Sequence, residues 1–106
     1  MFAEQRKSIR KIFKAKAVLA IEAEAPVAAR TTDVGANGVS VTLAGPVKPG
    51  QGCQLGFDLM VEGKIVKINA RARVQYCILS QGEFKVGLEF VNLELAAMTA
   101  LARFLR

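Results

Sequence analysis

Apolar and polar residues alternate along most of the chain, in short segments separated by glycine, proline and small polar residues. The longest alternation runs from Val66 to Ile78, where apolar even positions predict one buried face and polar odd positions a solvated one. Turns are expected at 35–38, 62–63 and 81–82, where glycine is paired with small or polar residues. The pattern predicts six strands, near residues 18–21, 27–32, 39–43, 54–61, 66–78 and 84–90.

After the last strand the apolar spacing changes from period two to that of a helix. The helix is expected over residues 92–106, with Asn92 as the N-cap, Glu94 in the first turn, and Arg103 and Arg106 in the last turn. Its apolar face comprises Leu93, Ala97, Ala100, Leu101 and Phe104.

Six short strands followed by one helix predict a mainly β protein. We expect a six-stranded antiparallel β-barrel whose C-terminal helix covers one opening, because closure removes exposed strand edges. The 106 residues fit a single domain, with a flexible basic arm at 1–13, a barrel at 14–91 and the helix at 92–106.

Composition narrows the class of function. Apolar residues make up 52% of the chain and charged residues 23%, which is typical of a soluble globular protein, and the most apolar segment is interrupted by charges and by Pro26. With no secretory signal either, a cytoplasmic location is expected. The chain has no histidine, and Cys53 and Cys77 lack a metal-ligand spacing. We therefore expect free thiols, no metal, no cofactor and no enzymatic activity, although the sequence is also compatible with a disulfide.

Positive charge is concentrated at the N-terminus. The net charge is +6, and residues 1–16 contain six lysines and arginines against Glu4. This distribution favours an anionic partner, which is a nucleotide, a nucleic acid or a membrane surface; the alternative is a solvated tail. Single-stranded nucleic acid is less favoured, because the chain has no tryptophan and only one tyrosine to serve as a stacking platform.

Two short motifs carry the candidate chemistry. Arg6-x-x-x-Arg10 lies in the basic arm, and Asp33-x-Gly35-x-x-Gly38 lies at a predicted turn. Arginine grips phosphate oxygens and stacks on purines, a carboxylate accepts hydrogen bonds from the guanine edge, and glycine allows backbone to approach a ligand closely. Together they indicate a site for a guanine-containing phosphodiester.

The order of these motifs, followed by Val86-Gly87-Leu88-Glu89-Phe90 and the terminal helix, resembles a PilZ domain along essentially the whole chain. Many PilZ domains are bacterial receptors for cyclic diguanylate (c-di-GMP) that regulate motility, secretion or exopolysaccharide synthesis. The resemblance implies that Arg6 and Arg10 contact phosphates and guanines, that Asp33 binds a guanine, and that the arm closes over the ligand. The ligand is then one c-di-GMP or an intercalated pair.

The resemblance has one departure and leaves several alternatives open. Gly35 stands where the family motif usually has serine, so one hydroxyl is missing and weaker binding is expected. Some PilZ domains act as adaptors through protein contacts alone, and Gly35 favours that alternative. The partner is then an unidentified bacterial protein or a fused effector domain, and the apolar helix is compatible with a homodimer. Additional site candidates are Lys7, Asn37, Arg71 and Arg73.

Overall fold

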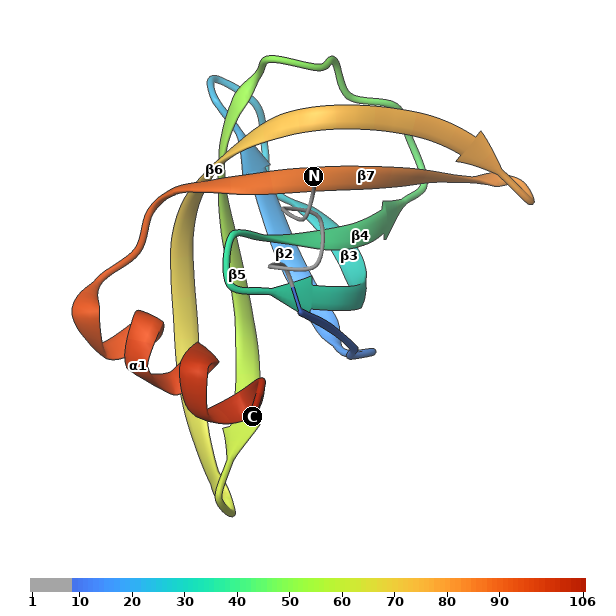
Figure 1. The fold of residues 1–106 in the computed structure, drawn as a ribbon. Helices are drawn as coiled ribbons and strands as arrows, with labels where there is room; N and C mark the ends of the chain where they lie inside the picture. Colours follow the sequence, from blue (N-terminus) through green and yellow to red (C-terminus); the bar gives the residue numbers. More distant parts are fainter. Residues whose placement is uncertain (1–8) are drawn as a thin grey trace, which may run out of the picture.

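The computed structural model describes residues 9–106 and contains seven strands and one helix in that range (Figure 1). The elements are β1 (Arg10–Ile12), β2 (Lys16–Ile21), β3 (Val27–Gly35), β4 (Gly38–Leu43), β5 (Gly52–Val61), β6 (Lys64–Ser80), β7 (Glu83–Asn92) and α1 (Leu95–Phe104). Six of the strands correspond to those expected from the alternation.

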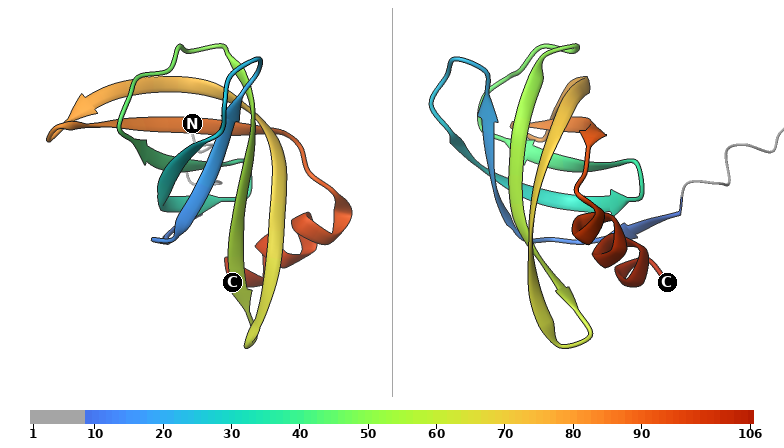
Figure 2. Two further views of the ribbon diagram at one scale, coloured as in Figure 1. Left: turned by 180° about the vertical axis from the view of Figure 1, so that it is seen from behind. Right: turned by 90° about the vertical axis from the view of Figure 1, so that its left-hand side faces the viewer.

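The strands form a closed antiparallel barrel. They follow the order β1-β3-β2-β5-β6-β7-β4, and a further pairing between β3 and β4 closes the sheet. The predicted six-stranded barrel is thus confirmed, with one extra strand: Arg10–Ile12, expected in the arm, pairs with the end of β3. The β5–β6 and β6–β7 hairpins extend beyond the barrel in different directions (Figures 1 and 2).

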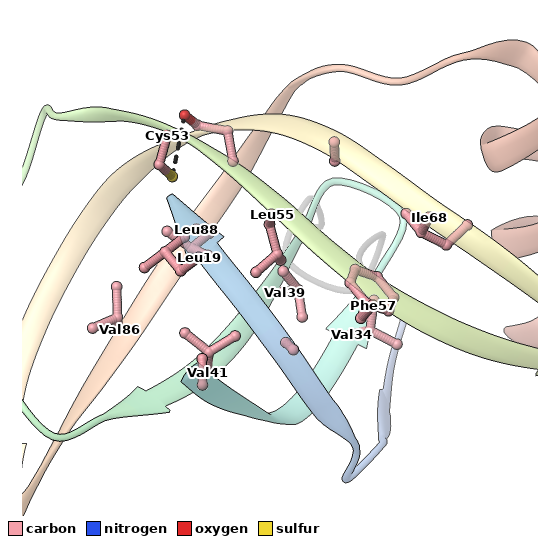
Figure 3. Packing of buried hydrophobic residues seen from close by; sticks show 14 of the residues in the cluster. Leu19, Val34, Val39, Val41, Cys53, Leu55, Phe57, Ile68, Val86 and Leu88 are labelled. Atoms are coloured by element: carbon pink, nitrogen blue, oxygen red, sulfur yellow. Dashed lines mark hydrogen bonds between the residues drawn. The ribbon is translucent and has the colours of Figure 1, made fainter. Parts of the chain in front are cut away.

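Inward-facing side chains from all sides of the barrel form one core. Leu19, Leu55 and Val41 are among its fully buried members, and they converge between strands that are far apart in sequence (Figure 3). Cys53 is buried at one end, where its Sγ donates a hydrogen bond to the carbonyl of Ala72, and burial raises the pKa of its thiol. Both cysteines are free, as expected.

Helix α1 packs beside the β5–β6 hairpin (Figure 1) and buries Ala97, Ala100 and Leu101. The predicted N-cap at Asn92 is wrong: Asn92 still pairs with β6, and the helix is preceded by Glu94, which makes no side-chain capping bond. Continuation of the strand ladder outweighs the local capping preference, so the helix begins later than predicted. The helix ends at Phe104, so Arg103 lies in its last turn as predicted, whereas Arg106 lies beyond its end. No helix in residues 9–106 is long and apolar enough to cross a membrane.

The link between β1 and β2 is fixed to the barrel by a buried threonine. Thr31 is 1% exposed, and its Oγ1 accepts a hydrogen bond from the amide of Ala15 at 2.8 Å and donates one to the carbonyl of Phe13 at 2.6 Å. The Phe13 ring packs edge-on against Phe104, with centroids 5.3 Å apart. These contacts hold β1 in place between the barrel wall and α1.

Candidate functional site

One row of residues crosses the outer face of the barrel from β1 to β6. Ile12 pairs with Asp33, Asp33 with Ser40, Ser40 with Gly87, and Gly87 with Tyr76. Directly paired residues in antiparallel strands project from the same face. Residues that are far apart in the sequence, such as Ser40 and Gly87, are thereby brought side by side.

Two β-bulges turn Asp33 and Tyr76 of this row outward. The registers of β3 and β6 shift at Thr32 and at Gln75, so that one extra residue is inserted in each strand. An extra residue reverses the side-chain alternation beyond it, and bulges commonly re-aim side chains at binding sites. Asp33 therefore faces outward although Thr31 faces the core, and Tyr76 faces outward although Val74 is buried.

The second bulge corrects a sequence-based expectation. The alternation from Val66 to Ile78 predicted a single buried face, but this holds only as far as Val74; Tyr76 is 37% and Ile78 is 55% exposed. The even-numbered residues beyond the bulge lie on the outer face, and Cys77 instead packs partly against the core.

Arg10 and Asp33 form an ion pair at one end of the row. Arg10 Nε and Nη2 both donate to Asp33 Oδ1, at 3.0 and 2.6 Å, and the two side chains are 40% and 29% exposed. Arg10 Nη2 also lies 3.5 Å from the hydroxyl oxygen of Ser40. The second arginine of the first motif and the acidic residue of the second motif are thus in direct contact.

The two motif glycines allow two different close approaches. Arg10 pairs with Gly35, and a Cβ there would lie 3.2 Å from Arg10 Nη1 and 3.1 Å from the carbonyl oxygen of Ile9. At Gly38 a Cβ would collide with the carbonyl of Leu88 on β7. Neither glycine has a positive φ, so space rather than backbone conformation requires glycine at Gly38. Asp33 and Gly35 belong to the end of β3, not to the expected turn.

A third glycine accommodates the tyrosine. A Cβ on Gly87 would lie 2.6 Å from Cζ and 2.7 Å from Cδ2 of Tyr76, because the ring covers the position that a side chain would occupy. The Tyr76 hydroxyl lies 3.5 Å from Ser40 Oγ, across β7. Gly87 thus lets Tyr76 reach from β6 to β4.

These residues line a cavity of about 390 Å³ on the outer face of the barrel. Two cations, Arg10 and Lys85, and two carboxylates, Asp33 and Glu89, border it. The full lining is Arg10, Asp33, Asn37, Gly38, Val39, Ser40, Gln75, Tyr76, Lys85, Gly87, Leu88 and Glu89. The cavity therefore offers an aromatic ring, hydroxyls, and charges of both signs within one space.

The predicted site residues are only partly brought together. Arg10, Asp33, Asn37 and Gly38 line this cavity, and Gly35 contacts Arg10. Arg6 and Lys7 lie outside the described residues. Arg71 and Arg73 border a separate hollow of about 470 Å³ between β2, β5 and β6.

Sequence reasoning missed Ser40, Tyr76, Lys85 and Glu89. Tyr76 was assigned to the core face because nothing in the alternation signals the bulge at Gln75. In the sequence Ser40 is an ordinary polar position between two valines, and its place beside Arg10 depends on long-range register. Among the described residues, no group of three histidine, cysteine or acidic side chains is arranged to hold a metal ion.

Comparison with solved structures places the fold among PilZ proteins. The Bacillus subtilis inhibitor of motility (MotI/DgrA) aligns with a TM-score of 0.83 and 19% identity, over 93% of this chain and 48% of its own. The PilZ domain of CeSA from a cellulose-synthesizing bacterium aligns with a TM-score of 0.62 and 15% identity, over 91% of this chain and 93% of its own. Borreliella burgdorferi PlzA, solved in complex with c-di-GMP, aligns with a TM-score of 0.65 and 14% identity, over 100% of this chain and 38% of its own. The chain thus spans about half of MotI and less of PlzA.

At these identities the solved structures show a shared fold and nothing further. A search of curated protein sequences gives no match. The family model of the PilZ domain matches residues 4–106 of the chain. This match includes both motifs, the closing strand and the terminal helix, and the chain is therefore a member of the PilZ domain family.

Proposed function

We propose that this domain is a bacterial, cytoplasmic receptor for c-di-GMP, without enzymatic activity. The observation that carries the proposal is the contact between Arg10 and Asp33 at the edge of one cavity, because these residues come from the two motifs that PilZ receptors use. PlzA, a protein of the same fold, has been solved with c-di-GMP. Arg6, which completes the first motif, lies in the segment that the structure does not describe.

When the ligand binds, the ion pair between Arg10 and Asp33 is broken, and each side chain bonds to the ligand instead. The ligand's phosphate takes the guanidinium, and its guanine edge takes the carboxylate. The pair is partly exposed, and such pairs stabilise a protein by only about 0 to 1 kcal/mol. The exchange is therefore inexpensive, and a dianionic ligand with two guanines replaces one ion pair by several charge-assisted hydrogen bonds.

Ligand binding at Arg10 acts on β1 and the arm that precedes it. Closure of the arm over the ligand changes the surface next to α1, because the adjoining β1 contacts that helix: Lys11 donates a hydrogen bond to the carbonyl of Phe104 at 3.0 Å. We propose that this change regulates motility, secretion or exopolysaccharide synthesis through a protein partner or a fused domain. The similarity in fold to an inhibitor of motility is consistent with such a role.

Gly35 supports a second candidate, an adaptor that acts through protein contacts without nucleotide. A serine at this position would bring a hydroxyl next to the Arg10 side chain. Loss of one net hydrogen bond costs about 0.5 to 1.5 kcal/mol, or about two- to tenfold in affinity. We therefore expect Gly35 to weaken c-di-GMP binding and not to abolish it.

Calorimetric titration with c-di-GMP tests the proposal, with GTP as the control ligand. We expect saturable binding by the wild type and a loss of about tenfold or more in Arg10→Ala and in Asp33→Ala, because bonds to charged groups contribute about 1.5 to 3 kcal/mol. Arg30→Ala is the matched control, since Arg30 lies on β3 outside the cavity lining. Absence of wild-type binding would favour the adaptor, whereas unchanged binding by both site variants would show that the ligand binds elsewhere.

A further inference from the structure

The single tyrosine of the chain occupies an unusual position for a side chain of its size. Tyr76 projects from β6 and lies across the Gly87 backbone, and its hydroxyl is near Ser40 on the far side of β7. One face of the ring is therefore covered by backbone. The residue is 37% exposed and lines the same cavity as Arg10 and Asp33.

The hydroxyl of Ser40 lies between the ends of Arg10 and Tyr76. It is 3.5 Å from Arg10 Nη2 and 3.5 Å from the Tyr76 hydroxyl, so these two groups are at most twice that distance apart. Ser40 is 4% exposed, yet both contacts are at the outer limit of a hydrogen bond. Buried hydroxyls usually have closer partners, and that of Ser40 retains the capacity to bond a group that enters the cavity.

We propose that Tyr76 is a stacking residue of the ligand site and that the hydroxyls of Tyr76 and Ser40 take the place of the serine hydroxyl missing at Gly35. The inference rests on the proposed function. An aromatic ring fixed on one face offers the other to a purine at little entropic cost, because its orientation is already set. Guanine then lies between two kinds of partner: the Arg10 and Asp33 pair at the β1–β3 edge, and the Tyr76 and Ser40 pair over β7.

Base stacking on an aromatic side chain contributes about 1 to 3 kcal/mol, which corresponds to about five- to 150-fold in affinity. Over most of this range, stacking outweighs the expected loss of about 0.5 to 1.5 kcal/mol from the absent serine hydroxyl. The site is thus able to bind a guanine nucleotide despite Gly35.

The experiment compares the affinity for c-di-GMP of the wild type, Tyr76→Phe and Tyr76→Leu by calorimetry. Phenylalanine keeps the ring and loses the hydroxyl, so we expect about two- to tenfold weaker binding. Leucine covers Gly87 but cannot stack, so we expect at least tenfold weaker binding. Ile78→Ala is the control, because Ile78 is the next outward residue of β6 and does not line the cavity. Thermal unfolding of each variant verifies that it is folded.

Fluorescence gives an independent readout. Tyr76 is the only tyrosine and the chain has no tryptophan, so intrinsic tyrosine emission reports on this residue alone. Stacking on guanine quenches the emission with the same midpoint as the calorimetric titration, after correction with free N-acetyltyrosinamide for light absorbed by the nucleotide. Emission that stays constant while c-di-GMP binds would overturn the inference.

The possible failures are distinguishable. If the wild type and Tyr76→Leu bind c-di-GMP with affinities within twofold of each other, Tyr76 is only a cover for Gly87, and the receptor proposal stands without this inference. If the wild type does not bind at all, the receptor proposal fails and the inference fails with it.

Discussion

Replacement of Gly87 by alanine tests the packing of the site more sharply than any loss of a charge. The new methyl group would occupy the space of the Tyr76 ring, so the ring must move. Overpacking typically costs about 1 to 3 kcal/mol of stability. Because Tyr76 is more than one-third exposed, it is able to swing into solvent, and we expect a cost in the lower half of that range, about 1 to 2 kcal/mol.

The same substitution has the opposite effect when the ring is absent. In a Tyr76→Ala background, alanine at position 87 meets no ring, and a glycine within a strand is about 0.5 to 1 kcal/mol less stable than alanine. Gly87→Ala should therefore stabilise the Tyr76→Ala protein slightly. The difference between the two backgrounds is a coupling energy of about 1.5 to 3 kcal/mol, since residues in contact are not additive.

Equilibrium urea unfolding of the wild type, both single variants and the double variant measures this coupling. The four midpoints are compared at a common slope, because a changed slope would indicate a different amount of exposed surface. Additivity within about 0.5 kcal/mol would refute the packing of Tyr76 on Gly87, and with it the basis for a preoriented ring.

Three further outcomes follow from the structure. Gly38→Ala should destabilise the fold by about 1 to 3 kcal/mol in urea unfolding, and no side-chain truncation should rescue it, because its Cβ collides with backbone; wild-type stability would contradict the approach of β4 to β7. Alkylation followed by mass spectrometry should modify Cys77 well before Cys53, because burial raises the pKa of the Cys53 thiol and reactivity requires the thiolate; equal rates would argue against that burial. Lys11→Ala should reduce stability by at most about 1 kcal/mol, since Lys11 is exposed, but it should lower hydrogen-exchange protection in the last turn of α1, because Lys11 binds the Phe104 carbonyl there. Unchanged exchange would exclude that contact.

The barrel was predictable because alternation depends on local burial. Both β5 and the first half of β6 have a regular inward and outward pattern, and closure into a barrel follows from the need to cover strand edges. The presence of the helix was predictable from the apolar spacing, but its first residue was not, because the pairing of Asn92 with β6 is a long-range interaction.

The site was predictable only in part, for a related reason. Arg10, Asp33 and Gly38 belong to motifs with a recognisable order in the sequence. Tyr76 and Ser40 do not, because a bulge at one position of β6 decides which face Tyr76 occupies, and only the register across three strands brings it to Ser40. Bulges leave no mark in an alternating sequence, so the sequence predicts a core position for Tyr76, which in the structure lines the cavity.

The most direct test of the account is a heteronuclear NMR titration of the uniformly labelled domain with c-di-GMP. If the cavity over β3, β4, β7 and β6 is the receptor site, the amide signals of Gly35, Gly38, Ser40 and Gly87 shift saturably and together, while that of Gly63 at the distal hairpin stays in place. Shifts gathered at the hollow between β2, β5 and β6, or no shifts at saturating nucleotide, would contradict it.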